Sequence, residues 1–265
     1  MNSLAVDELS LPPFKNFDFF FENNSFHIIA GTSGSGKTRL IKVLAGITPT
    51  KEKVRWNRTY LEKIPYTKIE EKIGVLLKEM IEIMNIKTVE EIWKESFTSK
   101  NMEKKEQEKQ IKEILSHLHM NGKRKKVLKD LLLEEQIKVF LVNEMIREKE
   151  ILLLDDPLKG IQKREERLEI MDLLSFYHKQ GNTIIMTTSS LEDVTEVPIN
   201  ALSILSNGKI VTTGKPLQVL QQDSLLDKLG LKIPFMVDLC VKLQYYDLVH
   251  EIILDKERLV KELWK

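Results

Sequence analysis

The feature that most constrains this chain is a glycine-rich motif, Gly31-Thr32-Ser33-Gly34-Ser35-Gly36-Lys37-Thr38, which fits the pattern G-x-x-x-x-G-K-[ST]. The apolar residues 26–30 come directly before it, and residues 39–45, which combine helix-forming residues with apolar spacing, follow it. A strand, a glycine-rich turn and a helix in this order are the context in which the pattern predicts a phosphate-binding loop. Because both flanks fit, a chance glycine-rich turn is the weaker interpretation.

The residue types in the motif predict how it binds a nucleoside triphosphate. Its glycines let the backbone turn tightly, so that several N–H groups point at phosphate oxygens, and the following helix adds its positive end. The Lys37 ammonium is expected to reach the β- and γ-phosphates, and the Thr38 hydroxyl is expected to ligate Mg²⁺. The predicted nucleotide-binding residues are Gly31, Thr32, Ser33, Gly34, Ser35, Gly36, Lys37, Thr38 and Arg39.

A second element of such a site lies far downstream, where the apolar residues 151–154 are closed by Asp155-Asp156-Pro157. A continuous apolar run of this kind indicates a strand buried on both faces of a parallel sheet. Asp155 stands at the carboxyl end of this strand, which is where α/β sheets place their ligands. We therefore expect Asp155 to hold Mg²⁺ through its water shell, with Thr38 and Asp155 as the metal-binding residues.

The N-terminal residues 1–30 have the pattern of short strands joined by turns. We expect an antiparallel β part here, with a hairpin-like turn at Asn23-Asn24 between residues 17–21 and 26–30. The alternating pattern of the phenylalanine cluster in residues 17–21 favours sheet core over a base-stacking surface.

The later segments predict helices and further strands. Residues 86–148 are charged and helical in composition, and residues 183–188 read as another buried strand. A hairpin turn at Asn207-Gly208 precedes residues 215–265, which are mostly helical. We expect an α/β nucleotide-binding domain over residues 1–214, with a helical insert at about 86–148 and a C-terminal helical extension over 215–265.

Composition narrows the class of protein. The formal net charge is +1, so there is no global electrostatic case for nucleic acid, and the basic residues 123–126 favour a solvated helix end over a site for phospholipid or a partner. The single cysteine, Cys240, excludes an intrachain disulfide and fits a reducing compartment. No apolar run approaches the ~18–20 residues that span a bilayer, and the first residues lack the features of a signal peptide. A cytosolic chain is expected.

Together these motifs resemble the nucleotide-binding subunits of ABC transporters. The resemblance covers nearly the whole chain, from the phosphate loop through the I-L-L-L-D-D-P segment to the N-G-K-I-V-T-T-G hairpin at residues 207–214. Three later segments look like the tail of the ATPase components of energy-coupling factor transporters, namely Gly214-Lys215-Pro216, residues 229–235 and residues 255–260.

This resemblance implies an ABC-type P-loop NTPase fold with an antiparallel β subdomain, ATP and Mg²⁺ as cofactors, and a peripheral place at the cytoplasmic face of the cell membrane. Subunits of that kind power the uptake of vitamins or of cobalt or nickel ions. They work as a dimer of two ATPase subunits docked on an integral membrane component, beside a separate substrate-capturing component. The expected partners are therefore a second ABC ATPase subunit and a membrane transport component, with a heterodimer favoured over a homodimer.

The sequence departs from the family's pattern at its signature, L-S-G-G-Q. This segment falls on residues 131–135, or one residue later on 132–136, and neither register contains the glycines. In the family the signature begins a helix whose N–H groups face the γ-phosphate held by the opposite subunit. We expect Glu134 and Glu135 to repel that phosphate, so the element is lost rather than varied.

Four other positions also differ. The family's γ-phosphate-sensing glutamine falls near Lys78, its switch histidine on Ser189 and its D-loop aspartate on Gln162. No tyrosine stands in residues 1–30 to stack on adenine, and Phe14 is only a weak substitute. These changes affect hydrolysis more than binding.

Asp156 stands where the family has the glutamate that polarises the attacking water, and it is the candidate catalytic residue. Its carboxylate lies back by about one C–C bond, ~1.5 Å, and a misplacement of ~1 Å already costs on the order of 10²-fold in rate. We expect ATP binding with weak or partner-dependent hydrolysis. Two functions stay open: an importer subunit, or a non-hydrolysing ATP-dependent scaffold that partners a competent ATPase. A stand-alone P-loop kinase or switch fits the motif spacing and the tail less well.

Overall fold

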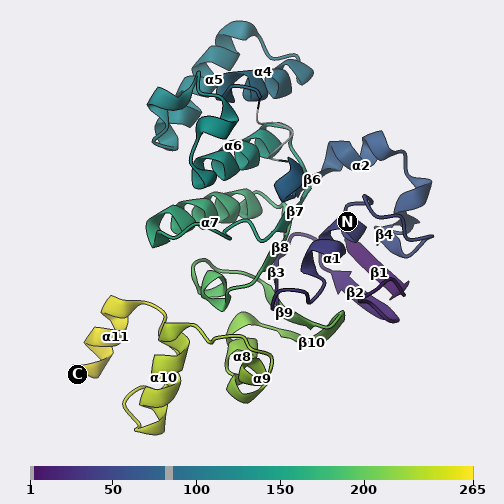
Figure 1. Cartoon of the computed structure of the whole chain (residues 1–265). Helices are drawn as coiled ribbons and strands as arrows, with labels where there is room; N and C mark the ends of the chain where they lie inside the picture. The colour runs from purple at the N-terminus through teal and green to yellow at the C-terminus, as the bar shows by residue number, and fades with distance from the viewer. Residues whose placement is uncertain (1–2, 81–85, 265) are drawn as a thin grey trace.

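A mixed β-sheet forms the centre of the molecule (Figure 1). The computed structural model describes residues 3–80 and 86–264, and within these ranges the sheet has six strands in the order β10-β9-β3-β8-β7-β6. Neighbouring strands run parallel, except that β10 is antiparallel to β9. The strands are β3 (Phe26–Ala30), β6 (Ile73–Leu76), β7 (Ile151–Asp155), β8 (Thr183–Thr188), β9 (Ala201–Ser206) and β10 (Lys209–Gly214).

The strand order brings the two predicted motifs to one edge of this sheet. β3 leads into the glycine-rich loop, β7 ends in Asp155, and both strands pair with β8. In the register, Ala30 is opposite Thr188 and Asp155 is opposite Thr187. β7 is buried from Ile151 to Leu154, as its continuous apolar run predicts. The predicted α/β fold with a buried parallel sheet is confirmed.

A smaller antiparallel sheet lies on the other side of helix α1 (Lys37–Leu44) from the central sheet (Figure 1). In the described part of the chain its strand order is β2-β1-β4-β5. Leu40 and Ile41 of α1 belong to one apolar cluster with side chains from both sheets, so the helix joins them. The strands are β1 (Leu4–Leu9), β2 (Phe17–Phe21), β4 (Val54–Trp56) and β5 (Thr59–Tyr60).

The hairpin predicted at Asn23-Asn24 is wrong. β2 pairs with β1, whereas β3 pairs with β8 and β9, so the two strands flanking this turn lie in different sheets. All residues of β3 are buried, and a strand buried on both faces belongs inside a parallel sheet. In β2, Phe17 and Phe21 are buried in the core, while Phe20 is exposed.

Helices between β6 and β7 form an apolar cluster of their own, which surrounds Trp93. The Trp93 Nε1–H donates to the Val139 carbonyl at 3.1 Å and so ties α4 to α6. Helix α5 ends at His117, with Leu118 as its C-cap. The helices are α4 (Val89–Ser99), α5 (Lys104–His117) and α6 (Leu133–Ile146), and α2 (Tyr66–Lys72) precedes β6.

The basic residues 123–126 lie beside this cluster, and two of them are ion-paired. Arg124 contacts Glu90 and Glu108, and Lys123 lies 3.2 Å from Glu135 at the start of α6. These pairs hold the segment against α4, α5 and α6. Residues 123–126 are therefore not a wholly solvated helix end, because two of them form ion pairs within the chain.

Helix α7 (Arg164–Lys179) packs between α6 and the central sheet, and the chain ends in short helices at the opposite end of the molecule from α4 and α5 (Figure 1). Pro234 is the N-cap residue of α10. The division into residues 1–214 and 215–265 stays a prediction. The last helices are α8 (Pro216–Leu220), α9 (Asp223–Lys228), α10 (Phe235–Tyr245) and α11 (Lys256–Leu263).

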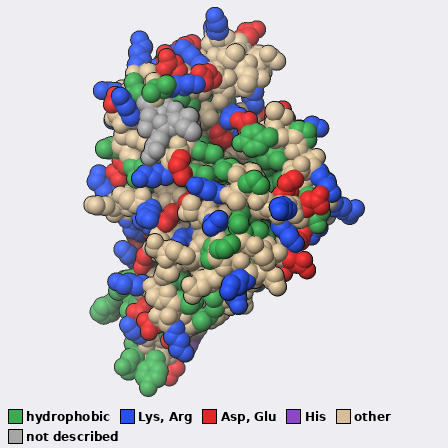
Figure 2. Space-filling view, turned by 45° about the vertical axis from the view of Figure 1, so that its right-hand side comes forward, with side chains coloured by type: hydrophobic (Ala, Val, Ile, Leu, Met, Phe, Trp, Pro, Cys, Tyr) green, Lys and Arg blue, Asp and Glu red, His purple; other side chains and the backbone are tan. Residues whose placement is uncertain are grey.

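Basic and acidic side chains are interspersed over the face shown in Figure 2, as the balanced composition leads one to expect. In the described ranges, no helix combines the length and the apolar character that crossing a membrane requires.

Candidate nucleotide-binding site

The glycine-rich loop connects β3 to α1 and begins the helix at Lys37. Gly36, the N-cap residue, has φ 109°, in the left-handed region that favours glycine. A Cβ at this position would lie 2.9 Å from Cγ of Pro13 and 3.2 Å from Cζ of Phe14. Both the backbone and the space therefore require glycine here, and the cradle shape of the loop follows from it.

Lys37 folds back over the loop. Its ammonium donates to the carbonyl oxygens of Gly31 and Thr32, and the side chain is buried. Burial lowers the pKa of Lys37, and the nearby Asp156 and Asp155 carboxylates oppose that shift. The buried Ser35 hydroxyl has no hydrogen-bond partner in the described part of the chain. A positive group and an unpaired hydroxyl inside a loop of backbone N–H groups fit a phosphate chain.

Thr38 and Asp155 lie side by side. The Thr38 hydroxyl donates to Oδ2 of Asp155 at 2.7 Å, and the Thr187 hydroxyl donates to Oδ1 at 2.8 Å. No group of three or more His, Cys, Asp or Glu side chains able to hold a metal exists among the described residues. An oxygen donor set of one carboxylate and one hydroxyl fits Mg²⁺, which is usually bound by one or two carboxylates together with substrate phosphates and waters.

A single cavity of about 720 Å³ gathers most of the predicted residues. Gly31, Thr32 and Ser35 do not line it, and the first and last of these are buried. Lys78 and Lys159 add positive charge to the wall, whereas Leu133 and Ile137 of α6 make part of it apolar. The predicted nucleotide-binding, metal and catalytic residues that line it are Ser33, Gly34, Gly36, Lys37, Thr38, Arg39, Asp155 and Asp156.

Asp156 is held from two directions. Its φ is 48°, and its N–H donates to the hydroxyl of Thr187 at 3.0 Å. Its carboxylate accepts from the Ser189 hydroxyl at 2.8 Å and from the Ser189 N–H at 3.4 Å. The residues expected at the base and switch positions therefore contact each other, and both line the cavity.

Sequence reasoning missed Thr187 as a site residue. It lies in β8, whose residues were read only as a buried apolar strand, yet its hydroxyl contacts both Asp155 and Asp156. A signal was available, because a threonine at the carboxyl end of a strand beside β7 falls at the ligand edge of a parallel sheet. Phe14, the weak candidate for stacking on adenine, is 1% exposed and packs against Phe17 with ring centroids 5.0 Å apart. It presents no free face to a base.

The segment at the signature position begins α6, with Leu132 as its N-cap. The Glu135 carboxylate accepts from the Leu132 N–H at 3.0 Å and lies 3.2 Å from the Lys123 ammonium. Glu134 is buried. The expectation that both glutamates present free charge to a phosphate needs correction, because Glu135 is paired within the chain. Its carboxylate occupies an N–H at the helix start, where a bound anion would otherwise be favoured.

Comparison with known proteins agrees with this geometry. The family model described as ABC transporter matches residues 14–159. The energy-coupling factor transporter ATP-binding protein EcfA2 of Clostridium tetani is 28% identical over 272 residues, which cover 98% of this chain and 90% of that protein.

Solved structures show the same fold. The structure of cbiO1 from Clostridium perfringens, part of the ABC transporter complex cbiONQ, has 22% identity and a TM-score of 0.69, and covers 91% of this chain and 99% of that one. A dimeric post-hydrolysis state of the ATP-binding cassette MJ0796, bound to ADP and Pi, has 17% identity and a TM-score of 0.68, and covers 80% and 98%.

A parallel sheet with a phosphate loop and an aspartate at one edge, and a helical insert between β6 and β7, define an ABC-type P-loop ATPase cassette. The chain belongs to the ABC transporter family. Such a cassette is an ATP-binding component. The predicted resemblance to energy-coupling factor ATPases is confirmed by the near full-length match to EcfA2.

Proposed function

We propose that this chain is the ATP-binding subunit of an energy-coupling factor importer for a vitamin or a metal ion. It binds Mg-ATP and couples closure of an ATPase dimer to transport, while hydrolysis at its own loop is impaired. The observation that carries the proposal is the cavity in which the phosphate loop, the Thr38–Asp155 pair and Asp156 meet. The match to an energy-coupling factor ATP-binding protein over 98% of this chain supports the importer assignment.

The residues present suit the phosphates and the metal ion. Lys37 and the loop N–H groups would hold the β- and γ-phosphates, and Arg39 stands at the rim of the same cavity. Thr38 and Asp155 would hold Mg²⁺, which neutralises phosphate charge when bound. Asp156 is the candidate base, with its carboxylate already in contact with Ser189.

The proposed partners are a second ATPase subunit and an integral membrane component, which keeps this chain at the cytoplasmic face of the membrane. A heterodimer is favoured, because α6 of this chain begins without glycines and the N–H of its N-cap residue, Leu132, is occupied by Glu135. A partner with an intact glycine-containing signature would complete the site around Lys37. The dimer of the similar cassette MJ0796 supports this arrangement of two subunits.

One observation favours a second candidate, a non-hydrolysing ATP-dependent scaffold. The chain is altered both beside its phosphate loop, where Asp156 is hydrogen-bonded to Ser189, and at the start of α6, which has no glycines. Copurification with the native partners, followed by assays of ATPase activity and transport, separates the two. A non-hydrolysing scaffold predicts that Asp156→Asn changes neither transport nor ATPase activity, whereas impaired hydrolysis at the Lys37 site predicts a partial loss of both.

The experiment that tests ATP binding is calorimetry with Lys37→Ala. We expect the variant to lose detectable Mg-ATP binding, because the ammonium neutralises phosphate charge deep in the loop. Lys42→Ala is the matched control, since Lys42 lies on the same helix but pairs with Glu79 at the surface at 3.0 Å. Equal ATP affinity for wild type and Lys37→Ala would contradict the assignment.

A further inference from the structure

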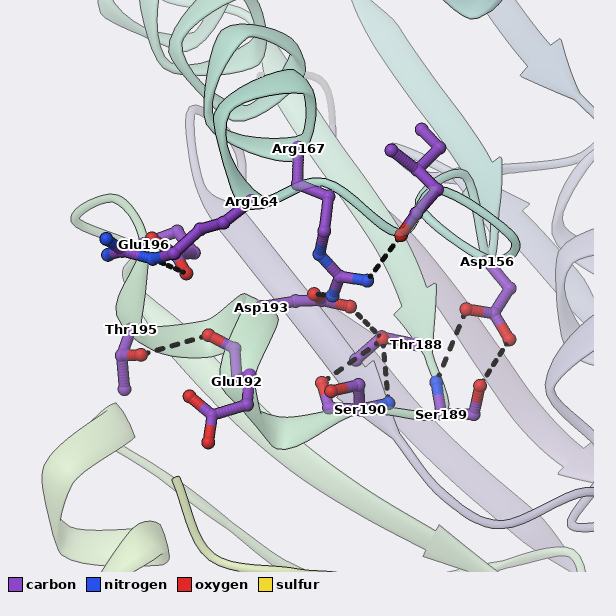
Figure 3. Close-up of polar contacts among 11 residues, drawn as sticks. Asp156, Arg164, Arg167, Thr188, Ser189, Ser190, Glu192, Asp193, Thr195 and Glu196 are labelled. Atoms are coloured by element: carbon purple, nitrogen blue, oxygen red, sulfur yellow. Dashed lines mark hydrogen bonds and ion pairs between the residues drawn. The ribbon is translucent and has the colours of Figure 1, made fainter. Parts of the chain in front are cut away.

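The ends of β7 and β8 are joined by a connected set of polar contacts that reaches beyond the nucleotide residues (Figure 3). At one end of this set, Asp156 and Ser189 face each other across the two strands. Both donors of Ser189, the hydroxyl and the backbone N–H, point at the same carboxylate, at 2.8 and 3.4 Å. Ser189 itself is exposed and lines the cavity, so its side chain orientation comes from this contact and from its backbone.

The backbone on either side of Ser189 is held from behind. The Thr188 hydroxyl donates to the Asp193 carboxylate and accepts from the Ser190 N–H at 3.0 Å. Thr188 is fully buried and pairs with Ala30 in the sheet register. With both neighbours fixed, the Ser189 N–H and side chain are directed to the same side, toward Asp156.

Asp193 lies in the 3₁₀ helix η4 (Leu191–Thr195) and is 1% exposed, so its charge needs a partner. The Arg167 guanidinium of α7 supplies it by an ion pair. Arg167 also donates to the Ile161 carbonyl at 3.3 Å, in the loop that follows Asp156. One arginine thus ties the loop after β7 to the segment after β8, the two segments that carry Asp156 and Ser189 (Figure 3).

A second ion pair, between Arg164 and Glu196, lies close to the Arg167–Asp193 pair, but its arginine is exposed to solvent. Arg164, on the same helix, contacts Glu196 at 3.0 Å, but the Arg164 side chain is 60% exposed. This pair lies apart from Thr188 (Figure 3). It joins α7 to the segment after β8 without reaching Ser189, and so provides a matched control.

We propose that Ser189 is a positioning residue that restrains the Asp156 carboxylate, and that the ion pair between Arg167 and the buried Asp193 holds Ser189 in that place. The inference rests on the proposed function, since it concerns hydrolysis at the Lys37 site. It assigns Ser189 an active role: the serine keeps bound ATP intact rather than merely failing to replace a histidine.

The chemistry explains why such a restraint matters. During hydrolysis Asp156 would accept a proton from a water whose oxygen bonds to the γ-phosphorus, while the bond to the β-phosphate oxygen breaks and ADP leaves. A general base must lie within hydrogen-bond reach of that water and be free to accept its proton. Two donors from Ser189 hold the Asp156 carboxylate in one orientation and occupy part of its accepting capacity.

The test uses the copurified complex with the partner ATPase carrying Gln in place of its own water-polarising Glu, so that ADP arises only at the Lys37 site. Ser189→Ala is expected to raise the rate of ADP formation from labelled ATP about tenfold, because general-base catalysis contributes ~10²–10⁴-fold and a shortened base recovers part of it. KM should stay within about twofold of the wild-type value. Ser189→Thr, which keeps the hydroxyl, should retain the low wild-type rate.

Three further variants separate positioning from general loosening of the fold. Ser190→Ala, the same change one residue later, should leave the rate unchanged. Asp193→Asn should raise it in the same direction as Ser189→Ala, whereas Arg164→Gln should not. Adding Asp156→Asn to Ser189→Ala should return the rate to the wild-type level, because the gain passes through this carboxylate.

An unchanged or slower rate in Ser189→Ala would overturn the inference, and so would a gain that survives the addition of Asp156→Asn. Calorimetry of the wild-type complex keeps the two proposals apart. Absent ATP binding at the Lys37 site would contradict the proposed function itself. Normal binding without the Ser189→Ala gain would contradict only the role of Ser189.

Discussion

The Thr38 hydroxyl donates a 2.7 Å hydrogen bond to the Asp155 carboxylate, although 117 residues separate the two along the chain. The other oxygen of this carboxylate accepts from Thr187 on the adjacent strand. Asp155 therefore has a defined orientation beside the start of α1. Oxygen ligands that are already oriented need little reorganisation when a metal and its phosphates bind.

We predict that Thr38→Val weakens the affinity for Mg-ATP, because it removes a hydroxyl from the expected metal position. The affinity for ATP in the presence of Mg²⁺ should fall about 10- to 100-fold. The affinity for ATP should change little when EDTA removes the metal. Calorimetry with and without Mg²⁺ measures both values. Thr38→Ser, which keeps the hydroxyl, is the control, and equal Mg²⁺ dependence in Thr38→Val and wild type would show that Thr38 is no ligand.

We predict that the purified chain alone hydrolyses ATP barely or not at all. In a homodimer each Lys37 site would face an α6 whose start lacks glycines, with Asp156 and Ser189 as its only base and switch residues. Loss of one preorganised charge-stabilising contact already costs ~10²–10³ in rate. A steady-state assay that includes a Lys37→Ala preparation as a contaminant control measures this. Turnover at an ordinary ~10 s⁻¹ would refute the prediction.

We predict that the two sites of a heterodimer are damaged differently. At the Lys37 site, the partner would contribute an intact signature segment, but hydrolysis would depend on Asp156 and Ser189. This site should therefore trap ATP and stabilise the closed dimer. The other site would have the partner's base and histidine but face the start of α6 with Glu134 and Glu135. Any turnover should therefore come from the partner's loop.

The measurement for the heterodimer compares two variants of the reconstituted complex. Asp156→Asn in this chain should leave most of the ATPase activity, whereas the equivalent change of the partner's glutamate should remove it. The reverse result would identify Asp156 as the working base.

We predict a pH dependence of stability that arises from His27. This histidine is 5% exposed, its Nε2 lies 2.8 Å from the Ser203 hydroxyl, and burial lowers its pKa from 6.5 to about 4. Between these values the unfolded chain binds a proton that the folded chain does not, so stability falls as the pH drops from 6.5 toward 4. The loss should reach about 3 kcal/mol below pH 4.

Urea unfolding at a series of pH values measures this loss. His27→Gln should flatten the stability profile between pH 6.5 and 4, whatever its effect on absolute stability. Parallel profiles for wild type and His27→Gln would exclude His27 as the source.

Patterns of neighbouring residues in the sequence were sufficient to predict most of the strands and turns. The apolar run before Asp155 predicted a doubly buried strand, and the Asn207-Gly208 turn predicted the hairpin of β9 and β10, because neighbouring residues decide these features. The same reasoning failed at Asn23-Asn24. A turn residue pair specifies a reversal of the chain but not which strands pair across it, and β3 pairs with β8 and β9.

By itself the sequence determined the phosphate loop, the aspartate that ends β7 and the positions that depart from the family, because these depend on residue identity and short spacing. Only the tertiary structure decided the contacts among them. Thr187 reaches Asp155, Ser189 holds Asp156, and Glu135 is paired with Lys123, because strand order and packing bring distant segments within hydrogen-bond distance. A hydrogen bond forms only over about 3 Å, and no pattern of nearby residues encodes such a separation between segments far apart in the chain.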